Sequence, residues 1–256
     1  MSILPLSRRE RLDVLRAEVR ALAPETHADV ERIPFGIDVM DRRLAGGGIV
    51  SGALHEMTGA TQSVADDAAA TLFAAGIAAR AGGGIVLWVM SKPDLFAPAL
   101  SQAGIPPSRL IQVEARRDED ALAVIEDGLR HGGLSAVVGE VSRVGLTATR
   151  RLQLAAEEGR TTALLLRRWR KARQDPLADP SAAVTRWRIA CAPSTPLPVQ
   201  GVGRPRWDVA LIRQRGGDPG SWLLEACDAT GSLALPAEPR DRSTSAGRRS
   251  TRRIAA

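Results

Sequence analysis

The sequence is poor in lysine and in aromatic residues. Lys92 and Lys171 are the only lysines among 35 basic residues, and the 256 residues include five tryptophans, three phenylalanines and no tyrosine. So few aromatic side chains argue against a platform on which nucleic-acid bases stack. The net charge of +6 favours a polyanionic partner. A GC-rich genome that replaces lysine codons with arginine codons is the alternative explanation.

Cysteine, histidine and long apolar runs are scarce as well. Cys191 and Cys227 are too few for a disulfide framework, and His27, His55 and His131 lack the spacing of metal ligands. We therefore expect reduced cysteines and no metal or other cofactor. No apolar run approaches the roughly 20 residues of a membrane-spanning helix, and the N-terminus lacks the layout of a signal peptide. We expect a cytoplasmic protein without membrane contact.

What the sequence does have is a strongly periodic N-terminal segment. Residues 6–23, LSRRERLDVLRAEVRALA, predict an amphipathic helix that ends at Pro24. Its apolar face is formed by Leu12, Leu15, Val19 and Leu22. This face either packs on the protein's own core or docks on a partner protein, and the sequence leaves both possibilities open.

The middle of the chain alternates apolar strands with helices, which predicts a parallel sheet covered by helices on both faces. We expect strands at 53–57, 84–90, 110–114, 134–140 and 161–167, and helices after Gly59, at 118–130 and at 146–158. After residue 167 the pattern changes. A strand at 184–192 and a hairpin that turns at 216–220 predict that antiparallel strands join the sheet toward the C-terminus.

These patterns define the expected fold class and domains. We predict a three-layer α/β core over residues 31–235, with a mostly parallel central sheet and antiparallel strands added near the C-terminus. Residues 1–30 form the N-terminal helix and a linker. Residues 236–256 form a polar, Arg-rich tail that we expect to be disordered.

Gly59 lies where a phosphate-binding loop would begin, between an apolar strand and an Ala-rich helix. Such a loop reads G-x-x-x-x-G-K-[ST], because a glycine lets the backbone wrap the phosphates, a lysine neutralises their charge and a hydroxyl binds Mg²⁺. Counted from Gly59, the last three places hold Val64, Ala65 and Asp66. All three requirements fail together. The sequence therefore predicts that this loop is degenerate and that the protein is no ATPase.

The same stretch has the signals of an ordinary helix start. Ser63 suits the N-cap, and Asp66 takes the place of glutamate in a capping box. Asp66 and Asp67 complement the helix dipole and occupy the electrostatic site that a phosphate would use. Glu140 ends a later strand near the position of a Walker B carboxylate. In the absence of the lysine and the hydroxyl, we interpret it as a solvated or ion-paired residue.

The order of these pieces resembles the core of RecA-like recombinases. The stretches that carry the resemblance are FGIDVMDRRLAGGGIVSGALHEMTG, GIVLWVMSKPDLF and AVVGEVSRV. In that match the lysine of the phosphate loop corresponds to Ala65, its threonine to Asp66, and the catalytic glutamate falls near Lys92. Every matched ATPase position is changed.

A closer resemblance is to the ImuA family, RecA-like proteins of inducible mutagenesis cassettes. It covers roughly residues 30–230 and is carried by IPFGIDVMDRRLAGGGIVSGALHEM, AVTRWRIACAPS and RWDVALIRQRGGDPGSWLLEACD. It implies a non-enzymatic accessory role in SOS-induced, error-prone translesion synthesis. The implied partners are an ImuB-like polymerase homologue, an error-prone C-family polymerase and RecA itself. Such a protein would associate with the nucleoid on DNA damage.

Single-stranded DNA is a further candidate partner. The candidate contacts are Arg167, Arg168, Trp169, Arg170, Lys171 and Arg173, which follow the last parallel strand, and the Arg-rich tail at 240–253 is a second candidate. A packed rim position for Trp169 and a merely solvated tail are the alternatives. The rival function is an ATP-dependent recombinase with a non-standard nucleotide site, whose cation would come from a partner, Arg80 or Lys92. A third is a SulA-like cell-division inhibitor, which the length of the chain fits poorly.

Overall fold

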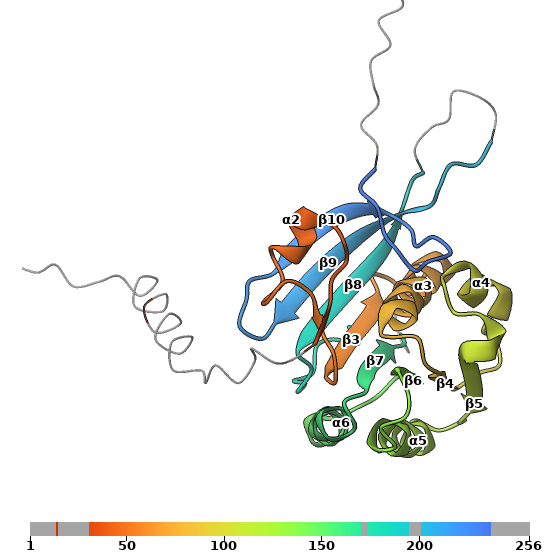
Figure 1. Ribbon diagram of the computed structural model, residues 1–256, viewed down its shortest axis with the longest axis vertical. Coiled ribbons are helices and arrows are strands. Elements are labelled where there is room, and N and C mark those ends of the chain that lie inside the picture. Colours follow the sequence, from red (N-terminus) through yellow and green to blue (C-terminus); the bar gives the residue numbers. More distant parts are fainter. Residues whose placement is uncertain (1–13, 15–30, 170–173, 195–200, 237–256) are drawn as a thin grey trace, which may run out of the picture.

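The fold is described from a computed structural model (Figure 1). The structure describes residues 14, 31–169, 174–194 and 201–236. The predicted apolar face formed by Leu12, Leu15, Val19 and Leu22 lies outside the described residues, as does the Arg-rich tail.

An eight-stranded sheet forms the centre of the molecule, in the order β10-β9-β8-β3-β7-β6-β4-β5. The strands from β3 to β8 are parallel to their neighbours, β9 is antiparallel to β8, and β10 is antiparallel to β9. The predicted fold class is therefore confirmed, and the antiparallel part begins at β9. The strands are β3 (Leu54–Gly59), β4 (Val86–Met90), β5 (Leu110–Glu114), β6 (Ala136–Val141), β7 (Thr162–Arg167), β8 (Thr185–Ala192), β9 (Arg206–Gln214) and β10 (Gly220–Glu225).

Helices cover both faces of the parallel strands, as Figure 1 shows. The helices α3 (Val64–Arg80) and α4 (Ala97–Gln102) pack on one face, and α5 (Asp118–Arg130) and α6 (Leu146–Gly159) pack on the other. Each pair encloses its own apolar core with the sheet. The shorter elements are β1 (Arg32–Ile33), α2 (Asp38–Asp41), β2 (Ile49–Val50) and the 3₁₀ turn η1 (Pro107–Arg109).

The segment before β3 is fastened to the core by aromatic rings. Phe35 stacks on Phe73 of α3 at 5.8 Å between ring centroids, and both rings contact Trp187 of β8 at 5.7 and 5.5 Å. Asp41 accepts hydrogen bonds from the backbone amides of residues 35–37, which fixes the turn that leads into α2. Three of the few aromatic residues of the chain are therefore used for packing.

His55 lies in the interior of β3 as a neutral imidazole. Its Nε2 is 2.9 Å from the carbonyl oxygen of Val50, which can only accept, so Nε2 carries the proton. Trp187 Nε1 donates to Thr185 Oγ1 at 2.6 Å, which leaves that hydroxyl to donate to His55 Nδ1 at 2.7 Å. Burial lowers the pKa of His55 to about 4, and the bond to Val50 offsets only part of this shift.

Stability is expected to fall on acidification because of His55. In the unfolded chain its imidazole takes up a proton near pH 6.5, but in the folded protein only near pH 4, so the unfolded state binds more protons between these values. Urea unfolding at pH 7 and pH 5 should differ by about 2 kcal/mol from this group alone. The His55→Asn variant should lose this difference. His131→Gln, at an exposed position, is the control and should retain it.

Candidate functional site

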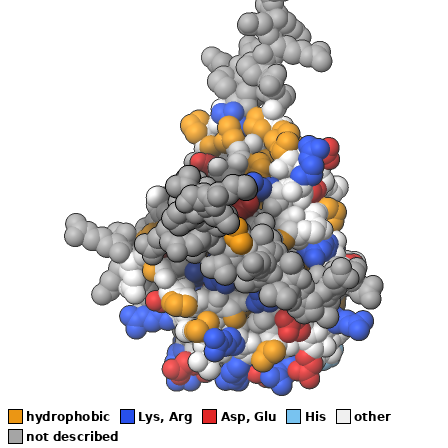
Figure 2. Space-filling model, turned by 90° about the vertical axis from the view of Figure 1, so that its left-hand side faces the viewer, with side chains coloured by type: hydrophobic (Ala, Val, Ile, Leu, Met, Phe, Trp, Pro, Cys, Tyr) orange, Lys and Arg blue, Asp and Glu red, His pale blue; other side chains and the backbone are white. Residues whose placement is uncertain are grey.

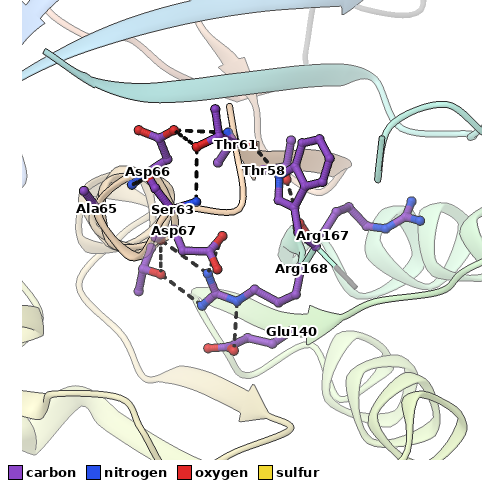
Figure 3. Close-up of polar contacts among 12 residues, drawn as sticks. Thr58, Thr61, Ser63, Ala65, Asp66, Asp67, Glu140, Arg167 and Arg168 are labelled. Atoms are coloured by element: carbon purple, nitrogen blue, oxygen red, sulfur yellow. Dashed lines mark hydrogen bonds and ion pairs between the residues drawn. The ribbon is translucent and has the colours of Figure 1, made fainter. Parts of the chain in front are cut away.

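The candidate site is the loop of residues 60–63, which connects β3 to α3 at the carboxyl edge of the sheet. Gly59 is the last residue of β3, and α3 begins at Val64. A Cβ on Gly59 would lie 2.9 Å from the backbone carbon of Asp66, so only glycine permits this close approach of strand and helix. The ends of β6 and β7 lie beside the loop (Figure 3).

The helix start follows the predicted N-cap but not the complete capping box. Ser63 Oγ accepts a hydrogen bond from the Asp66 amide at 3.1 Å, which confirms the cap. In a capping box, Asp66 would accept from the Ser63 amide in return. That amide instead donates to Thr61 Oγ1 at 3.1 Å. The predicted box is thus wrong in its second half, because Thr61 supplies the acceptor and leaves the Asp66 carboxylate free for other donors.

Asp66 is only 7% exposed, and its carboxylate lies beside Thr61 of the loop (Figure 3). One of its oxygens accepts from the Thr61 amide at 3.1 Å and from the Thr61 hydroxyl at 2.6 Å. The other accepts from the Cys191 amide of β8 at 2.8 Å. The Ala60 amide donates to the carbonyl oxygen of Ile189 at 2.7 Å. Three loop amides, those of residues 60, 61 and 63, therefore already have partners within the chain.

The side chains of Val64 and Ala65 have no polar group that would hold a phosphate. The Val64 side chain is 85% exposed and lies at the outer start of α3. The carbonyl oxygen of Ala65 accepts from Cys191 Sγ at 3.2 Å. Cys191 is exposed as a residue, but the protein partly desolvates its sulfur, which raises the pKa of the thiol, and the Asp66 carboxylate adds to this rise, so the sulfur stays protonated near neutral pH. Both Cys191 and Cys227 are free cysteines.

Glu140 of β6 is buried, and each of its carboxylate oxygens accepts a hydrogen bond. Its side chain is 4% exposed, Trp88 Nε1 donates to one carboxylate oxygen at 3.0 Å, and Arg168 Nε donates to the other at 3.1 Å. Of the two interpretations of this residue, the ion-paired one fits the geometry.

Arg168 follows β7 and bridges Glu140 to the first turns of α3 (Figure 3). Its terminal nitrogens donate to the carbonyl oxygen of Asp67 at 3.3 Å and to Thr71 Oγ1 at 3.0 Å. The Asp67 carboxylate is 3.8 Å from the same guanidinium. Burial raises the pKa of Asp67, and Arg168 opposes that shift. Arg168 is therefore a cation of the site itself, held by internal partners.

Arg167 points away from Arg168, as Figure 3 shows, and is buried on the other face of the sheet. Its side chain is 2% exposed, and its Nη1 donates to Glu56 Oε1 of β3 at 2.9 Å. Arg186 of β8 donates to the second oxygen of Glu56 at 2.8 Å. We call these three residues the buried triad. Sequence reasoning missed it, although a glutamate inside the apolar strand LHEM was an available signal.

The other predicted DNA contacts divide in two. Trp169 is half-buried and its indole N–H donates to the carbonyl oxygen of Gly59 at 2.7 Å, so it packs against the loop. Arg170, Lys171 and Arg173 lie outside the described residues. Arg167 and Arg168 form internal ion pairs. Arg170, Lys171 and Arg173 therefore remain the candidate DNA contacts of this cluster.

The rival ATPase function would take its cation from a partner, Arg80 or Lys92. Arg80 is at the opposite end of α3, where it donates to the carbonyl oxygens of Gly76, at 3.1 Å, and of Pro34. Lys92 follows β4 and is exposed.

Within the described ranges, no group of three or more His, Cys, Asp or Glu side chains is placed to hold a metal ion, and no helix is long and apolar enough to cross a membrane.

Comparison with known proteins identifies the family. No protein-family model matches the chain. Two curated relatives, both named Protein ImuA, come from Caulobacter vibrioides strains NA1000 / CB15N and ATCC 19089 / CIP 103742 / CB 15. Each is 43% identical over 206 residues, which cover 77% of this chain and 84% of the relative. The chain belongs to the ImuA family. The resemblance of its sequence to that family is thereby confirmed. The loop of residues 60–63, whose Thr61 donates to the carboxylate of Asp66, is thus a feature of an ImuA-family protein.

Proposed function

We propose that this protein is a non-enzymatic accessory protein of SOS-induced, error-prone translesion DNA synthesis. Membership of the ImuA family supports a role in SOS mutagenesis. The observation that carries the non-enzymatic part is the Asp66 carboxylate at the start of α3, which takes as its donors the amide and hydroxyl of the loop residue Thr61 and the Cys191 amide, at the helix end where an NTPase binds phosphate.

The surroundings of Asp66 argue against nucleotide binding in three ways. A carboxylate in the loop repels a triphosphate, and the amides of residues 60, 61 and 63 are engaged by other partners. The place of the lysine is taken by Ala65, which has no charge. Among the described residues, the Arg168 side chain gives its hydrogen bonds to Glu140, Asp67 and Thr71, so it is not free to neutralise the charge of the phosphates.

Calorimetry with Mg·ATP tests the non-enzymatic part. We expect no binding heat and no ATP hydrolysis by the full-length protein, with an intact P-loop ATPase as the positive control. A Kd below about 100 μM for Mg·ATP would contradict the proposal and favour the rival recombinase function.

The adaptor part of the proposal is tested on the same preparation, by copurification with the ImuB-like protein, the C-family polymerase and RecA. We propose that the apolar face predicted within residues 6–23 docks on these partners. Deletion of residues 1–24 is therefore expected to abolish the copurification.

The distribution of charge points to where a polyanion would bind. Residues 1–30 contain five basic and five acidic residues, segment 170–173 contains three basic residues and no acid, and the tail 237–256 contains six arginines and two acids. Because the whole chain has a net charge of +6, the remaining residues have a balance of −1. Figure 2 agrees with this, since basic and acidic side chains are interspersed over the described surface that it shows. We therefore propose that single-stranded DNA is bound through segment 170–173 and the tail.

A further inference from the structure

The Asp66 carboxylate is an anion that belongs to the chain itself, and it is bound by Thr61 of the loop and by the Cys191 amide of β8. Backbone amides and a hydroxyl at the start of a long helix are the donors that hold phosphate groups in nucleotide-binding proteins. Here the Thr61 amide and hydroxyl donate to the Asp66 carboxylate at 3.1 and 2.6 Å. The site thus keeps the donors of an anion-binding loop, although the residues that handle a nucleotide are absent.

The same carboxylate connects three elements of the fold. Asp66 is a residue of α3, its first oxygen holds the loop, and its second oxygen accepts from the Cys191 amide of β8 at 2.8 Å. The bond between the Ala60 amide and Ile189 adds a second connection between the loop and β8. β8 pairs with β3 on one side and with β9 on the other, so Asp66 ties the loop and α3 to the last parallel strand, the one that adjoins the antiparallel part of the sheet.

A built-in cation accompanies this anion. Arg168 joins Glu140 of β6 to the first turns of α3, and Trp169 next to it donates to the carbonyl oxygen of Gly59 at 2.7 Å. Loop, helix start and the residues after β7 are thus held together by contacts within the chain. In an NTPase, a bound nucleotide and its metal ion would supply such contacts.

We propose that Asp66 is a built-in anion that replaces a phosphate in this loop and holds the loop, α3 and β8 in one arrangement without any ligand. The inference deepens the proposed function, since it says what stands in the place of a nucleotide. It makes the loop a permanent structural joint, where a nucleotide-binding loop would change with its ligand.

Chemical rescue by a small anion tests this role. The Asp66→Ala variant removes the charged acceptor of the Thr61 amide, the Thr61 hydroxyl and the Cys191 amide, whose bonds to it are part-buried, and its Tm is expected to fall by roughly 5–10 °C. Sodium formate and inorganic phosphate should raise that Tm along a saturating curve, as mass action requires for a single site. Sodium chloride at equal ionic strength should not. The wild-type protein should show no such specific effect, because its own carboxylate fills the loop.

Asp67→Ala is the matched control, since it removes a neighbouring carboxylate with the same change of net charge. Asp67 accepts nothing from the loop, so formate should act on this variant no more than chloride does. If Asp66→Ala does not fold, Asp66→Ser keeps a short side chain, leaves space for an anion and is measured in the same way. An unchanged Tm, or equal effects of formate and chloride, would overturn the inference. Failure of the proposed function is a separate result, namely Mg·ATP binding by the wild-type protein.

Discussion

Replacing Glu56 with glutamine is expected to lower the free energy of unfolding by about 3–5 kcal/mol. Glu56 is fully buried and is the only described acidic partner of Arg167 and Arg186, whose nitrogens lie 2.9 and 2.8 Å from its two oxygens. Glutamine has nearly the same shape, so the substitution removes the charge without opening a cavity. Two buried guanidinium groups would then lack a counter-charge, and the cost of their desolvation would be uncompensated.

The buried triad is already incompletely satisfied in the native protein. Arg167 Nε and Arg186 Nη2 are buried and find no hydrogen-bond partner among the residues that the structure describes. A buried ion pair whose donors are only partly matched contributes little net stability, although breaking it on one side is costly. The triple variant with Glu56→Leu, Arg167→Met and Arg186→Met should therefore recover most of the stability that Glu56→Gln loses.

Urea unfolding distinguishes these outcomes, because urea carries no charge that would screen the triad. Glu114→Gln is the matched control: Glu114 pairs with Arg116 at 3.1 Å, but both side chains are exposed. This control should change the free energy of unfolding by no more than about 0.5 kcal/mol. Equal effects of Glu56→Gln and Glu114→Gln, or a triple variant as unstable as Glu56→Gln, would contradict the account given for the triad.

Local sequence signals were sufficient for most of the fold. The strand predicted at 110–114 and the helix predicted at 118–130 agree with β5 and α5 at both ends. Helical spacing marks the apolar side of α5, and three acids in its first turn mark its start. The N-cap at Ser63 was equally local, because the cap and its donor are three residues apart. These features need no knowledge of the tertiary structure.

The details of the site depend on contacts that no local pattern contains. In the sequence Arg167 and Arg168 belong to one basic cluster, but at the end of a strand successive side chains point to opposite faces, and each arginine pairs with its own carboxylate. Asp66 and Cys191 are 125 residues apart in sequence, and Glu56 and Arg186 are 130 apart. The alternation along β7 was the one signal that could have separated the two arginines.

Binding of single-stranded DNA is expected to be strong at low salt and to fall steeply as salt rises. If the three basic residues of segment 170–173 and the six arginines of the tail all neutralise phosphates, log Kobs should fall against log salt with a slope of about −6. Between about 50 and 200 mM salt the affinity would drop by roughly 10³–10⁴-fold. Anisotropy titrations of a labelled oligonucleotide at several salt concentrations measure this slope.

Variants of segment 170–173 and of the tail show how much each contributes to the slope of log Kobs against log salt. Combined alanine substitution of Arg170, Lys171 and Arg173 should reduce its magnitude by about 2, and deletion of residues 237–256 by about 4. A control removes three exposed arginines from the body of the protein, Arg42, Arg116 and Arg150, with the same change of net charge as in the segment. If DNA is bound by direct contact with phosphates, this control leaves the slope unchanged, because distant charges act only through a screened field. If the control and the segment variant lower the slope equally, binding is non-specific attraction to the whole surface, and the two segments are not the DNA contacts.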